Sequence, residues 1–468
     1  MQKKAHLEHN KREPMPDVYK EKFGMELPGS PYWNEKMETM PWDEVCKLHE
    51  KLLRAQIKYV WDKSSFYHRK LREAGLTPDD IKTLKDLQKV PFTTKEELRR
   101  SLDEAPPYGL HVCAPKDKIV RVHASSGTTG RPTLQCITKH DRETWTELVS
   151  RVFWCHGIRP GDTVAFGFSL AFFVGGLPLK DACENIGATF LPIGTGQTDR
   201  LLEMIRLTQA NVLSATPSYA LYLAEYAKKK GIEPKNLGIK KIESGAEPGV
   251  GIPAIRKKIE DEWGAAAFEG MGNADAAPII FGECPWQSGM HFLGQGIVIP
   301  ELIDPYTEEV LEFEEGVEGE LVYTTINREA SPVIRFRTGD HVKVWIERCE
   351  CGRTGFRIRC FGRTDDMLKV KGVKLWPSAV RDVVASFLPR VTGNIQIVLP
   401  KDLPSFSIDK LKVEVEYSEA VSKDDLPRLK AEIEEECATK LFVRPDIVLV
   451  PPGSLPRFEH KAKLVRRE

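Results

Sequence analysis

The stretch "ATFLPIGTGQTDRLLEMIRLTQANVLSAT", residues 188–216, joins a short apolar run, a segment with helical spacing and a second short apolar run. Similar apolar runs occur at 163–168, 240–245 and 265–270, and further helical segments at 217–230 and 252–263. Repeated strand–helix–strand units are typical of a parallel sheet covered by helices on both faces. The sequence therefore predicts an α/β fold whose ligands bind at the carboxyl ends of the strands.

The flanking regions predict a second, smaller unit. Residues 42–75 have the spacing of one long amphipathic helix or a pair, and antiparallel strands are expected around residue 300. A C-terminal α+β unit is expected from helices at 377–388 and 424–439 and strands near 394–399, 411–417 and 446–450. We predict a large α/β body with a β-rich subdomain (1–362) and a small mobile α+β domain (366–468).

Composition excludes several classes of protein. The 468 residues include 68 basic and 68 acidic ones, and this balance argues against nucleic acid or an anionic membrane as partner. The N-terminal segment lacks the apolar core of a signal peptide, and no apolar run reaches the roughly 18 residues of a membrane helix. Ten cysteines without a secretory signal favour a reducing compartment, so a cytoplasmic protein is expected.

The segment "HASSGTTGRPT", residues 123–133, gathers hydroxyls, glycines and one cation. Glycines leave backbone N–H groups free to converge on a phosphate, and hydroxyls add neutral donors. No GK[ST] follows, so this is not a Walker loop. From the residues alone, a flexible surface loop and a phosphate-binding loop both remain open. The candidate phosphate ligands are Ser125, Ser126, Gly127, Thr128, Thr129, Gly130 and Arg131.

A family resemblance decides between these readings. The loop, followed in order by "SGAEPG" (244–249), "RFRTGD" (335–340), "GRTDDMLKVKG" (362–372) and "GSLPRFEHKAK" (453–463), resembles the adenylate-forming superfamily of acyl-CoA synthetases, adenylation domains and luciferases. The phenylacetate-CoA ligase family is resembled in particular, through "SPYWNEKMETM" (30–40), "VPFTTKEELR" (90–99), "GTGQTDR" (194–200) and "ATPSYALYLAEYA" (215–227). The likeness runs from about residue 30 to the end.

The resemblance implies a two-step reaction. A carboxylate and ATP give an acyl-AMP and pyrophosphate, and the thiol of coenzyme A then takes the acyl group. Lys461 matches the family's adenylation lysine, a cation between two anions that otherwise repel each other. Asp340 matches the carboxylate that binds the ribose hydroxyls, and Arg363 an arginine on the ribose or phosphate. Asp365 matches the hinge of the small domain, and Gly245, Ala246, Glu247 and Pro248 are expected beside the adenine.

One motif departs from the family. Relatives place a Glu where it holds Mg²⁺ against the phosphates, but "FEGMGNADAAP" (268–278) has no Glu at that spacing. Either Asn273 or Asp275 is expected to substitute. An altered metal shell is favoured over lost adenylation, because the other motifs are intact.

The acid-binding pocket is expected in "AFGFSLAFFVGG", residues 165–176. Ring contacts from Phe166, Phe168, Phe172 and Phe173 suit a flat aromatic or arylalkyl acid, although core packing of half of them is an equal alternative.

Four further residues have the chemistry of a zinc site. Cys284 and His291 lie in one loop, and Cys349 and Cys351 form a Cys-x-Cys pair in another. Together they offer a tetrahedral shell of three sulfurs and one nitrogen, and some family members carry a comparable cysteine-bearing insertion. The alternative is that the cysteines are small core residues. If zinc binds, its role is structural.

Three other functions remain open at this point. The acyl group could pass to a carrier protein, the chemistry could stop at AMP transfer, or the altered metal motif could mark a non-catalytic nucleotide-binding relative. The partners expected are ATP, Mg²⁺, coenzyme A and an aromatic acid, and a homodimer is the one assembly considered.

Overall fold

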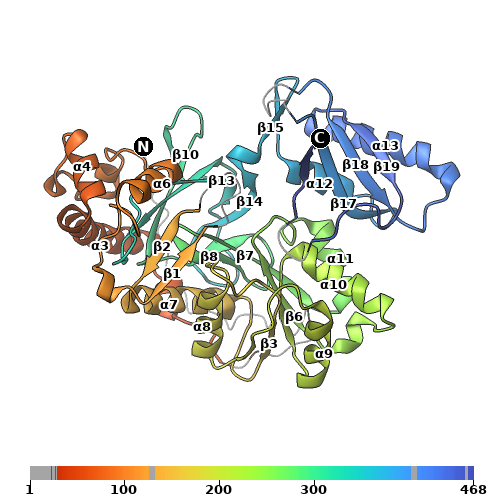
Figure 1. Cartoon of the computed structure of the whole chain (residues 1–468), viewed down its shortest axis with the longest axis horizontal. Helices are drawn as coiled ribbons and strands as arrows, with labels where there is room; N and C mark the ends of the chain where they lie inside the picture. Colours follow the sequence, from red (N-terminus) through yellow and green to blue (C-terminus); the bar gives the residue numbers. More distant parts are fainter. Residues whose placement is uncertain (1–22, 24–26, 28, 126–131, 402–407, 459–461) are drawn as a thin grey trace.

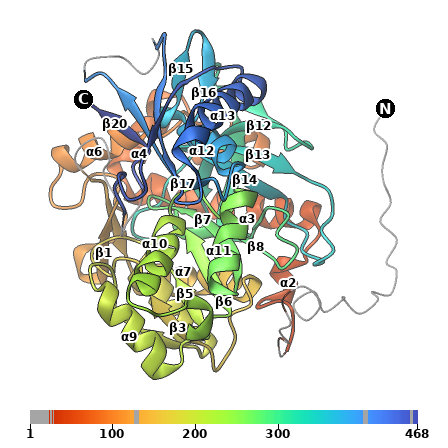
Figure 2. The same cartoon turned by 90° about the vertical axis from the view of Figure 1, so that its right-hand side faces the viewer.

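The computed structural model describes residues 23, 27, 29–125, 132–401, 408–458 and 462–468. Figure 1 shows two unequal parts, which we call the body (residues 29–363) and the C-terminal part (residues 368–468). In both views the C-terminal part lies over helices α10 (Pro217–Lys229) and α11 (Pro253–Trp263) of the body (Figure 2).

The body is built on one twelve-stranded sheet with the order β11-β10-β12-β13-β14-β9-β8-β7-β6-β5-β3-β4. Its parallel half confirms the predicted strands: β3 (Thr163–Phe166), β4 (Thr189–Leu191), β5 (Val212–Ser214), β6 (Lys241–Gly245) and β7 (Ala266–Asn273). The other strands pair antiparallel: β8 (Ala277–Glu283), β9 (Met290–Phe292), β10 (Val298–Ile303), β11 (Val310–Leu311), β12 (Glu318–Thr325), β13 (Phe336–Trp345) and β14 (Arg357–Arg363).

Helices cover both faces of the parallel half, as predicted. One face packs against α7 (Lys139–Cys155) and α8 (Leu177–Ile186), in a core that contains Phe153, Phe166 and Cys183. The opposite face packs against α9 (Thr198–Thr208), α10 and α11, in a core that contains Leu213 and Trp263. Alternate residues of the strands supply the two cores, which is the period of two that a strand imposes.

The N-terminal helices are α2 (Glu35–Glu38), α3 (Trp42–Lys63), α4 (Ser65–Glu73), α5 (Leu84–Leu87) and α6 (Lys95–Glu104). The predicted segment 42–75 is therefore a pair of helices. The chain turns at Ser64, whose hydroxyl accepts a hydrogen bond from the amide of Tyr67 at 3.2 Å and caps the second helix.

Strands β1 (Arg121–Ala124) and β2 (Leu134–Ile137) form a separate antiparallel hairpin. In the sequence, the glycine- and hydroxyl-rich segment connects these two strands, which are labelled in Figure 1.

The C-terminal part has its own sheet, in the order β19-β18-β17-β20. It contains the hairpin β15 (Leu368–Val370) and β16 (Val373–Leu375), then α12 (Pro377–Ala385), β17 (Val391–Leu399), β18 (Lys412–Tyr417), α13 (Leu426–Leu441), β19 (Asp446–Val450) and β20 (Val465–Arg467). A separate apolar core joins its helices to this sheet. The predicted helix at 377–388 is shorter than expected, since it ends ahead of Pro389, and the short strand β20 was not predicted.

Within the described residues, no helix has both the length and the apolar character that crossing a bilayer requires.

Candidate active site

The ends of the expected phosphate-binding loop are tied together. The amide of Ser125 donates to the carbonyl of Thr133 at 3.1 Å, and the amide of Thr133 donates to the hydroxyl of Ser125 at 3.1 Å. Both residues are buried. Ser126, Gly127, Thr128, Thr129, Gly130 and Arg131, all predicted phosphate ligands, lie outside the described residues. The structure therefore fixes where this loop begins and ends.

Asp275 accepts hydrogen bonds from residues at the end of that loop. Its Oδ1 accepts hydrogen bonds from the Thr133 hydroxyl at 2.5 Å and from Nε2 of Gln135 at 3.0 Å. Its Oδ2 lies 3.7 Å from Nζ of Lys95. The Asp275 side chain is 3% exposed, so both oxygens are engaged inside the protein. Of the two magnesium candidates, Asp275 therefore has a structural partner for each oxygen.

Asn273, the other candidate, points to Asp340 instead. Its side-chain amide donates to Oδ2 of Asp340 at 3.4 Å. Asp340 lies on β13 directly opposite Arg363 on β14, and Nη1 of Arg363 is 3.7 Å from its Oδ1. The structure thus brings together three residues that were predicted from three separate motifs.

Arg363 is held in place by two carboxylates. Its guanidinium donates to both oxygens of Asp365, at 2.8 and 3.0 Å, and to the carbonyl of Thr338 at 2.8 Å. Burial by itself would lower the pKa of Arg363, but the charges of Asp340 and Asp365 raise that pKa above its ordinary value. Arg363 is therefore a fixed positive charge beside Asp340.

The segment from the last residue of β6 onward contains the residues predicted to lie beside the adenine, 245–248. A Cβ on Gly245 would lie 2.5 Å from the carbonyl oxygen of Gly270, so only glycine fits there, and Ala246 has a left-handed φ of 70°. Glu247 then accepts a hydrogen bond from the amide of Ser218 at 2.8 Å, at the N-terminus of α10.

Glu247 also reaches the C-terminal part. Its other carboxylate oxygen accepts a hydrogen bond from the amide of Ala462, the residue that follows Lys461. Lys461 itself lies outside the described residues. Nearby, Nη1 of Arg381 on α12 donates to the carbonyl of Pro248 at 3.4 Å. The segment 245–248 is therefore a contact between the two parts of the chain.

The four phenylalanines of the predicted acid pocket divide into two pairs. Phe166 is fully buried in the core, and its ring contacts those of Phe168 and Phe190. Phe172 and Phe173 are 54% and 42% exposed, and the carbonyl of Phe172 accepts a hydrogen bond from the amide of Ala124 at 2.9 Å. This second pair lies at the end of β1, next to the residue at which the expected phosphate-binding loop begins.

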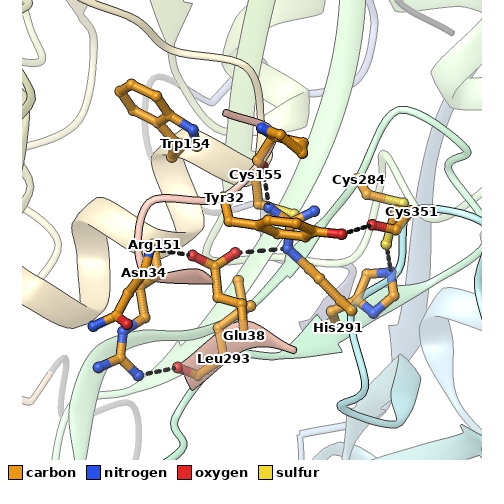
Figure 3. A network of polar contacts seen from close by, with 12 residues as sticks. Tyr32, Asn34, Glu38, Arg151, Trp154, Cys155, Cys284, His291, Leu293 and Cys351 are labelled. Carbon is orange, nitrogen blue, oxygen red and sulfur yellow. Dashed lines mark hydrogen bonds and ion pairs between the residues drawn. The ribbon is translucent and has the colours of Figure 1, made fainter. Parts of the chain in front are cut away.

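The structure brings the four predicted zinc ligands into one buried cluster. The ligand atoms of Cys284, His291, Cys349 and Cys351 all lie within 4.8 Å of one another, and every one of these residues is buried. Figure 3 shows the imidazole of His291 beside the sulfur of Cys351, with Nε2 at 3.3 Å from Sγ. We call this group the cysteine–histidine cluster.

The spacing of this cluster suits a tetrahedral metal ion. The sulfurs of Cys284 and Cys349 are 3.7 Å apart, too far for a disulfide. Two thiolates, each about 2.3 Å from a tetrahedral zinc, lie roughly 3.8 Å apart. Nδ1 of His291 is buried and has no hydrogen-bond partner in the described structure, while Nε2 faces the sulfurs. The donor set and its geometry both fit zinc.

Sequence reasoning missed the residues that hold this cluster to the N-terminal segment. The hydroxyl of Tyr32 donates to the carbonyl of Cys351 at 2.9 Å (Figure 3). Nε of the buried Arg353 donates to Glu38 at 2.8 Å. Lys95, Thr133 and Gln135 were missed in the same way as partners of Asp275. Each of these residues is an ordinary polar side chain in the sequence, and only the fold makes it a partner.

Comparison with known proteins shows which enzymes this chain is similar to. Residues 372–467 match the model of the AMP-binding enzyme C-terminal domain. A phenylacetate-coenzyme A ligase of Thermus thermophilus is 35% identical over 442 residues, covering 91% of this chain and 97% of the relative. A phenylacetate-coenzyme A ligase of Escherichia coli is 31% identical over 433 residues, covering 92% and 96%.

Solved structures agree. A 2-hydroxyisobutyryl-CoA ligase in the postadenylation state superposes with a TM-score of 0.88 at 31% identity, covering 95% of this chain and 94% of the other. The same ligase gives a TM-score of 0.72 in an open conformation and 0.70 in the thioesterification state, with 95% of this chain covered each time.

The fold and the site thus define an adenylate-forming enzyme. Within that superfamily the chain belongs to the phenylacetate-CoA ligase family, as its resemblance predicted. It is an ATP-dependent, AMP-forming acid–CoA ligase, with ATP, coenzyme A and a carboxylic acid as its small-molecule substrates.

Proposed function

We propose that this ligase activates an aromatic or arylalkyl carboxylate of the phenylacetate type. The observation that carries the proposal is the match to four curated phenylacetate-coenzyme A ligases at 31–35% identity over at least 90% of this chain. The exposed rings of Phe172 and Phe173 support it, because they lie beside the loop at which the acid meets ATP.

The proposed chemistry has two displacements. A carboxylate oxygen attacks the α-phosphorus of ATP, and the bond to pyrophosphate breaks as the acyl-AMP forms. The sulfur of coenzyme A then attacks the acyl carbon, the bond to AMP breaks, and the thiol proton is released to solvent. In the first step Lys461 neutralises both reacting anions. Asp340 accepts hydrogen bonds from the ribose hydroxyls, and the guanidinium of Arg363 lies 3.7 Å from its Oδ1.

Magnesium is proposed to enter with ATP, held chiefly by the phosphates and water. The described residues offer it little, because Asp275 is fully engaged and Asn273 is a neutral amide. Glu247 and its neighbours in 245–248 are proposed to contact the adenine.

The two steps are proposed to use two arrangements of the chain. Asp365 lies in the short turn Thr364–Asp366 that joins β14 of the body to β15 of the C-terminal part, and we propose it as the hinge between domains 1–362 and 366–468. The higher TM-score against the postadenylation state supports assigning the present arrangement to the adenylation step.

The cysteine–histidine cluster is proposed to bind one structural Zn²⁺. Its burial argues against a catalytic role, since no substrate reaches it. Metal analysis of protein purified without chelators tests this. One zinc per chain is expected, and a trace amount would remove the proposal. The homodimer and the cytoplasmic location stay predictions; light scattering after size exclusion tests the former.

An acid panel tests the substrate class. ATP–pyrophosphate exchange and thioester formation are measured with phenylacetate, benzoate, indoleacetate and 2-hydroxyisobutyrate. We expect kcat/KM for an aromatic acid to exceed that for 2-hydroxyisobutyrate at least tenfold. A preference for the aliphatic acid would overturn the substrate class while leaving the ligase reaction in place. Exchange without thioester would favour an enzyme that stops at AMP transfer.

A further inference from the structure

A small network of charges joins the C-terminal part to helix α10. Nε of Arg457 lies 3.1 Å from a carboxylate oxygen of Glu225, which projects from α10 of the body. The same guanidinium donates to both oxygens of Glu416 on β18, at 2.7 and 2.9 Å. Arg457 therefore bridges one carboxylate of each part.

The two halves of this bridge differ in strength. Glu416 is fully buried and also accepts a hydrogen bond from the amide of Leu455 at 3.1 Å, so its pair with Arg457 belongs to the fold of the C-terminal part. The side chain of Glu225 is 31% exposed and that of Arg457 is 21% exposed. A partly exposed ion pair is weak, and Arg457 still has its ion pair with Glu416 when the pair with Glu225 breaks. The bond across the two parts is therefore the one that breaks at low cost.

Arg457 is close in the sequence to Lys461, the proposed adenylation lysine. Arg457 precedes Lys461 by four residues, which span at most about 14 Å even when fully extended. On the other side of Lys461, the amide of Ala462 donates to Glu247 of the body. In the sequence, Lys461 therefore comes between two residues that contact the body, Arg457 and Ala462. A third contact lies nearby, where Nζ of Lys258 on α11 donates to the carbonyl of Thr392 on β17 at 2.7 Å.

We propose that Glu225, through Arg457, is a positioning residue for the adenylation step. It holds the segment that carries Lys461 against the body while the acyl-AMP forms. The pair must then open before the C-terminal part can present a different face for thioester formation. The inference rests on the proposed two-arrangement reaction, and it gives a role to Glu225, to which the family resemblance assigned none.

Variants at Glu225 test this directly, because they leave the buried Arg457–Glu416 pair intact. Glu225→Gln removes the charge, and Glu225→Lys opposes Arg457 with a like charge. The matched control is Asp199→Asn, which removes a carboxylate of α9 that contacts Tyr226 and Lys230 near the same end of α10 but entirely within the body. The half-reactions are measured separately: acyl-AMP formation without coenzyme A, and thioester formation from preformed acyl-AMP.

We expect acyl-AMP formation to slow about three- to fivefold in Glu225→Gln and about tenfold in Glu225→Lys, with the control unchanged. Thioester formation should be unchanged or faster. A purely structural role would slow both half-reactions alike, and that result, or no change in Glu225→Lys, would overturn the proposal.

A readout independent of turnover separates this inference from the proposed function. Amide hydrogen exchange in the peptide that contains Leu455 and Ala462 should be faster in both Glu225 variants than in the wild type and Asp199→Asn. Unchanged exchange would contradict the positioning role even if catalysis fell. A wild type that makes no acyl-AMP, with exchange altered as expected, would count against the proposed substrate class and leave the positioning contact supported.

Discussion

The cysteine–histidine cluster and the nucleotide site are built in opposite ways. At the cluster, three thiols and one imidazole are buried, and their ligand atoms already lie within 4.8 Å of one another. At the proposed nucleotide site, Asp340 and Arg363 are 3.7 Å apart with side chains 12% and 29% exposed, and the predicted phosphate loop and Lys461 come from other motifs of the sequence. One set of residues is complete within the body, whereas the other is shared between the body and the C-terminal part.

This difference indicates that the cluster serves stability and the proposed nucleotide site serves catalysis. With the proposed zinc bound, a buried shell of thiols and imidazole would hold its loops together permanently, because opening it would expose the ion and its ligands to water. A site shared by two parts of the chain can be taken apart in each turnover, because its contacts are few and half-exposed. Changes at the nucleotide site should therefore alter catalysis without altering stability, and changes at the cluster should do the reverse.

The largest expected effect is that of Lys461→Ala. Removing the cation between two anions should lower ATP–pyrophosphate exchange by about 10²- to 10³-fold. The melting temperature and the zinc content should stay at wild-type values. Lys463→Ala, two residues away on the exposed tail, is the control. If Lys461→Ala exchanged at the wild-type rate, the assignment of the adenylation lysine would be wrong.

The reverse experiment is Cys351→Ser. Losing one of three thiolates should remove the bound zinc and lower the free energy of unfolding by about 2–5 kcal/mol. At low temperature the KM for ATP should remain within about twofold of the wild type. Denaturant unfolding and metal analysis measure this against Cys46→Ser on α3, a cysteine that is not one of the four cluster residues. Equal stability of Cys351→Ser and the control would show that no metal staple exists.

An intermediate effect is expected at Asp275, which stabilises the stem of the phosphate loop rather than touching ligand. Asp275→Asn keeps the shape but weakens the bonds to Thr133 and Gln135 and leaves Lys95 without its counter-charge. We expect the KM for ATP to rise about tenfold and the free energy of unfolding to fall by about 1–3 kcal/mol. The KM for the acid should not change. A change in magnesium requirement instead would make Asp275 a metal ligand.

The smallest effect is expected at Glu243, a fully buried carboxyl that accepts a hydrogen bond from Ser214 and belongs to neither site. Burial raises its pKa from 4.5 to about 7. Between these pH values the unfolded chain has lost the proton that the folded chain retains, so the wild type loses stability as pH rises. Above pH 7, Glu243→Gln should therefore be more stable by about 1–3 kcal/mol, and below pH 4.5 it should gain nothing. Thermal melts at pH 4.5 and 8 measure this, and a gain at the lower pH would contradict it.

The features that the sequence predicted are those that depend on local residues alone. The parallel half of the sheet was predictable because each strand and helix is defined by its own local spacing, as in residues 188–216. The four cluster residues were predictable because cysteine and histidine carry their chemistry with them. Strand β20 was not predictable, because its three residues are specified by parallel pairing with β17 and not by their own pattern.

The sequence did not predict the hydrogen-bond and ion-pair partners of the motif residues. Asp275 was predicted as a magnesium ligand from its place in a motif, whereas its hydrogen bonds depend on a hairpin about 140 residues away in the chain. Arg457 lies in the motif "GSLPRFEHKAK", but only the fold shows that Glu225 is its partner. Such contacts depend on three-dimensional pairing, which neither composition nor spacing encodes.

Rapid quench of the purified enzyme with ATP, Mg²⁺ and phenylacetate, first without coenzyme A, tests the two-step account most directly. The account predicts that acyl-AMP and pyrophosphate accumulate to at most one equivalent per chain. Addition of coenzyme A should then convert that same acyl-AMP to thioester and AMP. Release of ADP and phosphate, or thioester formed with no acyl-AMP on the way, would contradict it.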